Sequence, residues 1–303
     1  IINIFYCFYF DFLLSIKSYI IVLILSTIIG YILFFLGKKH KDSINIYEQI
    51  FLILIIYFFT SFFILIPFYF SLYDFSFLNS YFEAISGLTC TGFSIITNIE
   101  NIDSPLILWR SSSQWLGGFY FIIFLVLIFS NKQLNFKMID LTFNLEKKIN
   151  FSTNIINVTY RIFFIYLSLT ILIFSLFLIS GIRLYDSLNL TMTIVSSGGF
   201  IPTETLEDIV RNNFQSIILC LGFIISILNF YIFYNFIFSR NNLKEHREDT
   251  YLIVLILAFF LIFYFINDVR ILTALINVLS SFGTSGITIG NVTGSFSLYF
   301  III

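Results

Sequence analysis

Three short runs of small and hydroxylated residues interrupt an otherwise apolar sequence: Thr89–Phe93 (TCTGF), Ser196–Phe200 (SSGGF) and Gly283–Ile287 (GTSGI). An apolar span and a short amphipathic stretch precede each run, and a second apolar segment follows it. Irregular backbone is tolerated at membrane depth only where protein buries it or where it lines a water-filled path. The runs therefore predict reentrant loops that line one pathway.

A residue that favours helix starts stands thirteen positions before the last glycine of each run. These residues are Asn79, Asp186 and Thr273. The spacing predicts a half-helix of about nine or ten residues, capped at these positions, that ends at each run. Glycine in a membrane helix also permits close packing, and any one run alone favours that role. The shared register of all three favours a pore loop.

The composition is that of a membrane protein. Of 303 residues, 59% are hydrophobic and 11% charged, and the mean hydropathy is +0.98. A soluble domain with this balance could not cover its surface with polar groups. We predict an all-α polytopic membrane protein with candidate spans at 2–14, 16–36, 48–70, 105–130, 157–182, 214–238 and 250–267, and the start of another at 296.

The cysteines Cys7, Cys90 and Cys220 lie far apart and indicate neither a disulfide framework nor a metal site. Both histidines, His40 and His246, fall in charged loops. We therefore expect no cofactor. No nucleophile–base pair or His, Asp and Glu cluster lies at predicted membrane depth, so a membrane-embedded enzyme is not favoured.

The charges are distributed unevenly between the two sides of the predicted membrane. Most of the 16 Lys and Arg residues fall in one set of short loops: Lys38, Lys39 and Lys41, then Lys132, Lys137, Lys147 and Lys148, then Arg240, Lys244 and Arg247. The positive-inside rule predicts that these loops are cytoplasmic. The glycine runs would then face an acidic external vestibule that concentrates cations, although ordinary loop solvation also explains the acids.

Backbone carbonyls can replace the hydration shell of a cation, and glycine allows the backbone conformations that aim them at one axis. The predicted ion-binding residues are Thr89, Cys90, Thr91, Gly92, Phe93, Ser197, Gly198, Gly199, Phe200, Thr284, Ser285, Gly286 and Ile287. Potassium is expected on the carbonyls of Thr89, Cys90, Thr91, Gly92, Gly198, Gly199, Ser285 and Gly286.

Three neighbouring features complete the predicted site. Gly117 and Gly118 are expected to let their helix pack tightly behind the first glycine run. Arg110, at the outer end of the same span, is interpreted as reaching towards the membrane interface. Glu83 is expected to support the first half-helix or the vestibule.

These residues resemble the Trk/Ktr/HKT superfamily of potassium and sodium transporters, in particular its TrkH-like branch. Phe82–Gly92 resembles the first pore loop of that family, and Trp109–Arg110 with Gln114–Gly118 resembles the helix after it. Ser197–Phe200 resembles the second pore loop, and Asn277–Thr288 is a looser match to the third.

The resemblance implies four pseudo-repeated helix–pore loop–helix units around one pathway, of which three are seen. On this chain it implies a two-helix extension at 1–36, pore units at 37–130 and 131–238, and an incomplete third unit at 239–303. It also implies a homodimer in the plasma (inner) membrane, regulated by a cytoplasmic nucleotide-binding ring protein of the TrkA/KtrA type. Lipid and protein, not nucleic acid, are the expected partners.

Glycine at the filter position of each loop matches the potassium pattern of that family, so the resemblance implies potassium uptake driven by the membrane potential. A sodium or mixed K⁺/Na⁺ transporter remains an alternative, as does a truncated, non-conducting product. The tail Ser297–Ile303 resembles the opening of a span, so the last helix is expected to be incomplete.

Overall fold

The computed structural model describes residues 1–38, 45–129, 151–228, 233, 247–267 and 269–290, and these are helical or irregular, with no strand among them. Five of the described helices are long and apolar enough to cross a membrane. They are α2 (Leu13–Gly37), α3 (Ile46–Tyr69), α5 (Ser104–Phe129), α7 (Phe151–Ile179) and α11 (Arg247–Asn267). The prediction of an all-α polytopic membrane protein is confirmed.

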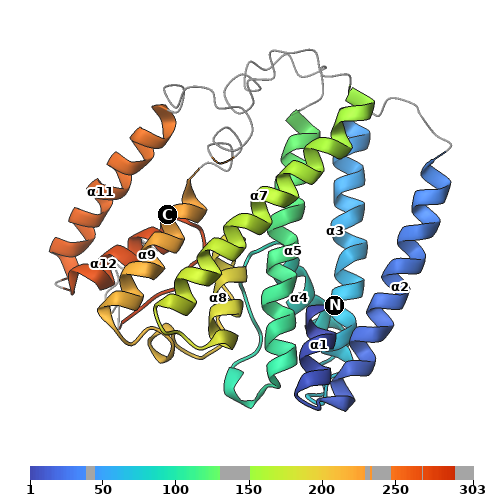
Figure 1. The fold of residues 1–303 in the computed structure, drawn as a ribbon, viewed down its shortest axis with the longest axis horizontal. Helices are drawn as coiled ribbons and strands as arrows, with labels where there is room; N and C mark the ends of the chain where they lie inside the picture. Colours follow the sequence, from blue (N-terminus) through green and yellow to red (C-terminus); the bar gives the residue numbers. More distant parts are fainter. Residues whose placement is uncertain (39–44, 130–150, 229–232, 234–246, 268, 291–303) are drawn as a thin grey trace.

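Shorter helices lie between the long ones. They are α1 (Ile2–Tyr9), α4 (Phe77–Leu88), α8 (Leu184–Val195), α9 (Asn213–Ile227) and α12 (Ile271–Phe282), with single turns η1 (Ile99–Asn101) and η2 (Leu206–Asp208). The half-helices α4, α8 and α12 gather in the lower half of Figure 1. Helix α4 packs against α3 and α5, α8 against α7, α5 and α9, and α12 against α11 and α9.

A repeated order emerges from this packing. A long helix leads into a half-helix and then into a returning helix in α3–α4–α5 and in α7–α8–α9, and α11–α12 begins the same order again. Each half-helix has 12 residues. The unit boundaries given above stay a prediction.

The predicted helix starts are wrong by one turn. Asn79, Asp186 and Thr273 each occupy the third position of their helix, and the flanking cap residues are Ser76, Arg183 and Arg270. Ser76 caps α4 by accepting a hydrogen bond from the Asn79 amide (3.2 Å). A polar residue in the first turn is also favourable, because amide groups there lack helical partners. The sequence pattern of a first-turn residue therefore resembles that of a cap.

Two predicted spans also differ from the structure. The span at 2–14 is a short helix, α1, followed by a break before Leu13. In the span predicted at 214–238, helix α9 ends at Ile227, because Leu228 leaves the helix with a ψ of 141°, and 229–232 and 234–238 lie outside the described residues. Hydropathy continues across both breaks, so it could not reveal them. Most of the basic loop residues and the span expected from 296 lie outside the described residues.

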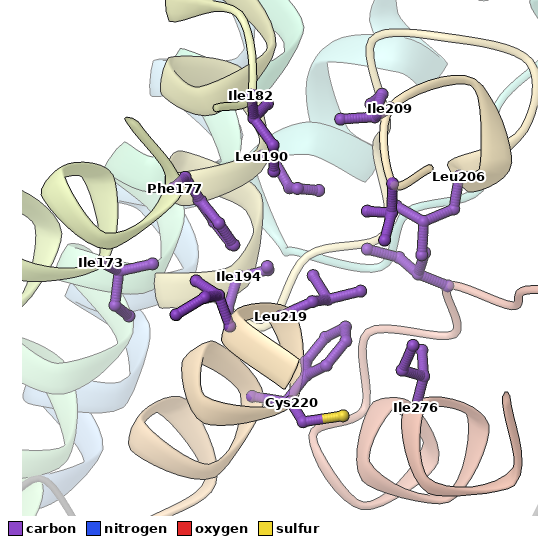
Figure 2. Packing of buried hydrophobic residues seen from close by; sticks show 14 of the residues in the cluster. Ile173, Phe177, Ile182, Leu190, Ile194, Leu206, Ile209, Leu219, Cys220 and Ile276 are labelled. Carbon is purple, nitrogen blue, oxygen red and sulfur yellow. The ribbon is translucent and has the colours of Figure 1, made fainter. Parts of the chain in front are cut away.

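The largest buried apolar cluster joins the second and third repeats (Figure 2). Phe177 of α7, Ile194 of α8 and Leu219 of α9 pack in it with Ile276 of α12. Ile287, the last residue of the third glycine run, lies in the same cluster. A second cluster, which includes Phe68, Ala84 and Leu88, holds the first repeat together. Apolar packing thus holds the half-helices against their neighbours.

Candidate functional site

We call Thr89–Phe93, Ser196–Phe200 and Gly283–Ile287 the first, second and third glycine loops. Each begins with the same turn. In the first, the Cys90 amide donates to the Gly87 carbonyl (3.0 Å) and the Thr91 amide donates to the Ser86 carbonyl (3.0 Å). The equivalent pairs are Ser197 to Ile194, Gly198 to Thr193, Thr284 to Ser281 and Ser285 to Ser280. This is the Schellman pattern that ends helices.

The turning residue is not glycine in any of the three loops. Cys90, Ser197 and Thr284 have φ values of 56°, 56° and 53°. Glycine usually fills this left-handed position, and another residue there costs roughly 1–2 kcal/mol. Packing around each loop must therefore hold the turn in place.

A hydroxyl residue six positions before the last glycine braces each loop. Ser86 Oγ donates to the Phe93 carbonyl (2.5 Å), and Thr193 Oγ1 donates to the Phe200 carbonyl (2.6 Å). The equivalent Ser280 Oγ lies 3.0 Å from Ser285 Oγ. These hydroxyl residues were not predicted as part of the site, although their shared register could have revealed them.

The structure brings the three glycine loops together. A β-carbon placed on Gly92 would lie 2.8 Å from the Gly199 Cα, and one placed on Gly199 would lie 2.7 Å from the Ser285 carbonyl oxygen. In the described part of the chain, a β-carbon on Gly286 would have no neighbour within 4 Å. The loops thus follow one another in the order first, second, third, and the third has an open side.

Two cavities border these loops. One, of about 470 Å³, is lined by residues at the ends of the half-helices, including Thr89, Ser196 and Thr284. The other, of about 270 Å³, is lined by Gly199 and Gly286 with the acidic residues Glu204 and Glu207. Helix C-termini carry partial negative charge. Both openings therefore favour cations over anions.

In the segment after the second glycine loop, hydrogen bonds favour the ionised form of the Asp208 carboxyl. The side chain and amide of Thr205 both donate to Asp208 Oδ2, at 2.7 and 3.1 Å. These hydrogen bonds lower the pKa of the Asp208 carboxyl from its ordinary value. Among the described residues, no group of three or more His, Cys, Asp and Glu could hold a metal ion through side chains.

The side chain nine positions before the last glycine ties its half-helix to the outgoing loop. Glu83 Oε1 accepts from the Ile95 amide (2.7 Å), twelve residues later. At the matching place in the third repeat, Asn277 Oδ1 accepts from the Ile289 amide (2.9 Å) and Nδ2 donates to the Ile289 carbonyl (3.1 Å). In the second repeat the matching position is Leu190. The residue twelve positions later is Pro202, which has no backbone N–H and so needs no acceptor.

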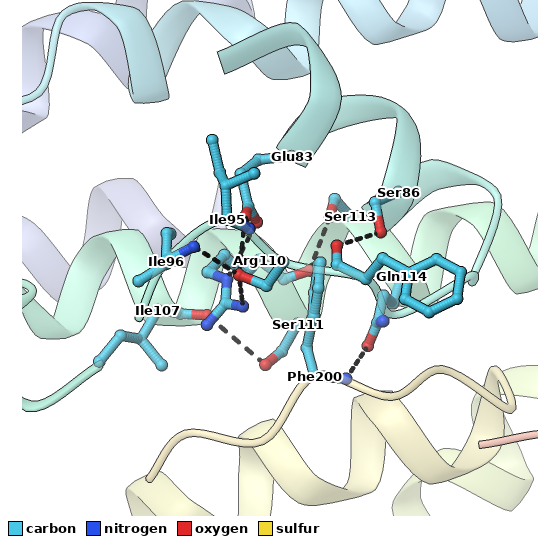
Figure 3. A network of polar contacts seen from close by, with 12 residues as sticks. Glu83, Ser86, Ile95, Ile96, Ile107, Arg110, Ser111, Ser113, Gln114 and Phe200 are labelled. Carbon is cyan, nitrogen blue, oxygen red and sulfur yellow. Dashed lines mark hydrogen bonds and ion pairs between the residues drawn. The ribbon is translucent and has the colours of Figure 1, made fainter. Parts of the chain in front are cut away.

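Arg110 lies buried beside the first loop, with 2% of its surface exposed. Its Nε is 3.5 Å from Glu83 Oε2, and its Nη2 donates to Ser94 Oγ at 3.0 Å. Its Cζ is also 4.2 Å from the ring centroid of Phe200, in the second loop. Figure 3 shows this network. The interpretation that Arg110 reaches the membrane interface is wrong, because helix packing places a carboxylate partner beside it.

The rest of α5 packs closely behind two loops. Gln114 Oε1 accepts from the Phe200 amide (3.2 Å), and its carbonyl accepts from Cys90 Sγ (3.3 Å). A β-carbon on Gly117 would overlap the Leu88 carbonyl, and one on Gly118 would lie 2.8 Å from the Ser196 Cβ. The paired glycines therefore let α5 approach the first half-helix and the second loop, as expected.

The residue after each last glycine differs sharply in exposure. Phe200 and Ile287 are 2% and 4% exposed, whereas Phe93 is 69% exposed. Phe200 packs against residues of the first repeat, and Ile287 against those of the second. Each buried side chain thus enters the repeat before its own. Whether the predicted site residues bind ions stays a prediction.

Comparison with known proteins gives sequence relatives, although no family model matches the chain. The chain is 29% identical to an uncharacterized cation transporter of Methanocaldococcus jannaschii over 243 residues, which are 78% of this chain and 49% of that protein. It is 27% identical over 124 residues to the Trk system potassium uptake protein TrkH of Halomonas elongata, covering 40% of this chain and 26% of that one. The chain spans about half the length of the first relative.

A solved structure has the same fold. The crystal structure of the potassium transporter TrkH from Vibrio parahaemolyticus matches with a TM-score of 0.69 and 18% identity. The match covers 95% of this chain and 66% of that chain. The TrkH-like resemblance is thereby confirmed in sequence and in architecture.

Proposed function

We propose that this chain, a TrkH-like member of the Trk family, forms most of a potassium uptake pathway. The observation that carries the proposal is the meeting of the three glycine loops, Gly92 beside Gly199 and Gly199 beside Ser285. Carbonyls presented by such loops can replace the hydration shell of a cation. The names of its relatives, a cation transporter and potassium uptake proteins, support the same class of substrate.

In the proposed mechanism, a potassium ion passes between the two cavities through the carbonyls of the glycine loops. The C-terminal ends of α4, α8 and α12 face the larger cavity, where their partial negative charge stabilises the ion. The membrane potential drives entry, at about 2.3 kcal/mol per charge for every 100 mV. No cofactor takes part.

The orientation and assembly are parts of the same proposal. The basic loops face the cytoplasm of a plasma membrane protein, as the positive-inside rule requires. The acidic cavity beside Glu204 and Glu207 then faces outwards. A homodimer and a cytoplasmic nucleotide-binding ring partner are proposed from the family resemblance alone.

We also propose a fourth repeat that completes the ring. The open side of Gly286 and the exposed ring of Phe93 support it, because both positions face a neighbouring repeat elsewhere in the site. A sodium or mixed pathway is the second candidate. Glycine at all three positions 92, 199 and 286 favours potassium over that candidate.

The test is uptake by the full-length gene product in bacteria that lack their own potassium uptake systems. We expect growth at low potassium and a potassium flux that exceeds the sodium flux. Equal fluxes, or a sodium flux that is larger, would establish the second candidate. Absence of flux of either ion from correctly inserted protein would contradict the transport proposal.

A further inference from the structure

Arg110 is a charged residue buried inside the helix packing, where charges are costly. Moving a cation and a carboxylate out of water costs several kcal/mol for each ion, and a well-packed apolar pair is often equally stable. Arg110 and Glu83 are nevertheless 2% and 0% exposed. Stability alone therefore does not explain why α5 places an arginine here.

The contacts of Arg110 lie in two different repeats. Glu83 and Ser94 hold the guanidinium on the side of the first repeat, at 3.5 and 3.0 Å. The opposite partner is the face of Phe200, which belongs to the second glycine loop. A planar guanidinium can donate in its plane and also lie over a ring. Figure 3 shows Arg110 between these groups.

Phe200 transmits this contact to the glycines. It directly follows Gly199, whose Cα lies beside Gly92. Its amide is held by Gln114 and its carbonyl by Thr193. The backbone that joins the Phe200 ring to Gly199 is thus hydrogen-bonded on both sides of the ring, which links Arg110 to the place where Gly199 meets Gly92.

The boundary between the second and third repeats is built differently. There Ile287, the counterpart of Phe200, lies in an apolar cluster with Ile194 and Leu206. Among the described residues, a buried arginine thus contacts Phe200 at the boundary between the first and second repeats. At the boundary between the second and third repeats, Ile287 is packed in an apolar cluster instead.

We propose that Arg110 is a positioning residue that sets the spacing of the first and second glycine loops and thereby the ion selectivity. Glu83 keeps the guanidinium charged and oriented, and Phe200 converts its position into the position of Gly199. This inference rests on the proposed transport function. Arg110 does not itself contact the ion in this proposal.

The experiment compares potassium and sodium permeability in the full-length protein with Arg110→Gln, Arg110→Lys and Phe200→Leu. We expect Arg110→Gln and Phe200→Leu to lower the K⁺/Na⁺ ratio on the order of tenfold, because each removes the cation–ring contact. Arg110→Lys, which keeps the charge without the planar fork, should lose less. The matched control is Arg183→Gln, since Arg183 is 74% exposed and pairs with Asp186 away from Phe200.

A double variant separates positioning from charge balance. Glu83→Gln with Arg110→Gln leaves no buried charge at this pair, so the melting temperature should recover relative to Arg110→Gln alone, while the K⁺/Na⁺ ratio stays low. Recovery of the ratio in the double variant would overturn the inference. So would a normal ratio in Phe200→Leu, which leaves the ion pair intact and remains informative if Arg110→Gln fails to fold. Failure of the unmodified protein to carry potassium would instead reject the proposed function.

Discussion

At the glycines of the three loops, two different constraints exclude a side chain. Gly92 has a φ of 77° and lies against the backbone of Gly199, so both its conformation and its space require glycine. Gly199 is limited by space, because a β-carbon would lie 2.7 Å from the Ser285 carbonyl oxygen. Gly286 is limited by its φ of 65°. The three equivalent positions therefore require glycine for different reasons: backbone conformation at Gly286, space at Gly199, and both at Gly92.

Gly92→Ser in the full-length protein should weaken discrimination against sodium. The new β-carbon disfavours the left-handed backbone by about 1 kcal/mol and displaces the second loop, so the carbonyls no longer converge as before. Permeability ratios measured under mixed potassium and sodium gradients check this expectation.

The control for that variant is Gly30→Ala in α2, where a β-carbon would have no neighbour within 4 Å in the described part of the chain. Alanine favours the helix there by roughly 1 kcal/mol, and selectivity should not change. An unaltered ratio in Gly92→Ser would remove Gly92 from the predicted filter.

The glycines of the loops could be predicted from the sequence, whereas their contact partners could not. The shared register of Gly92, Gly199 and Gly286 is a local property, and the loops do meet. The Arg110–Glu83 pair joins residues on two helices, so only the packing of α4 on α5 reveals it. Spacing along one chain gives no signal for such a contact.

At the level of the helices, the three half-helices share their length and their final turn but differ in the side chain that contacts the outgoing loop. All have 12 residues and end in the same turn. The side chain at the seventh residue of each half-helix matches the groups of the outgoing loop. Glu83 accepts from an amide, Asn277 bonds to an amide and a carbonyl, and Leu190 stands opposite Pro202 in the same register. The half-helices were predictable from their glycine ends, whereas the early end of α9 was not, because apolar composition continues past Ile227.

Asn277→Leu should loosen the third loop. It removes both hydrogen bonds to Ile289 and leaves a partly buried amide without its acceptor, which costs about 1–3 kcal/mol. Hydrogen exchange of the peptide that contains Ile289 should accelerate on the order of tenfold. Asn277→Asp keeps the acceptor for the Ile289 amide and is the matched control. Equal exchange in the two variants would show that the brace does not hold the loop.

In the molecule as a whole, the described repeats contact one another in chain order, and the first and last each have one open flank. The second loop packs on the first, the third packs on the second, and the outer flanks at Phe93 and Gly286 stay open. Open flanks at membrane depth leave backbone groups without partners, at several kcal/mol for each group. A further repeat between these flanks would close the pathway.

Residues 1–303 expressed alone should therefore insert into the membrane yet fail to rescue potassium-uptake-deficient bacteria. Insertion requires apolar spans and basic loops, which this segment has. Membrane fractionation and growth at low potassium check the two parts. Rescue at ordinary expression levels would mean that copies of the segment complete the circle or that three repeats suffice.

In the proposed pathway, the three glycine loops together bind a monovalent cation. Anomalous diffraction from crystals of the full-length protein grown in rubidium tests it most directly, since rubidium can replace potassium and its position can be seen. We predict a rubidium peak between the first, second and third loops, at the level of the Gly92, Gly199 and Gly286 carbonyls. A folded protein with no peak between these loops, or with its ions bound only elsewhere, would contradict the claim.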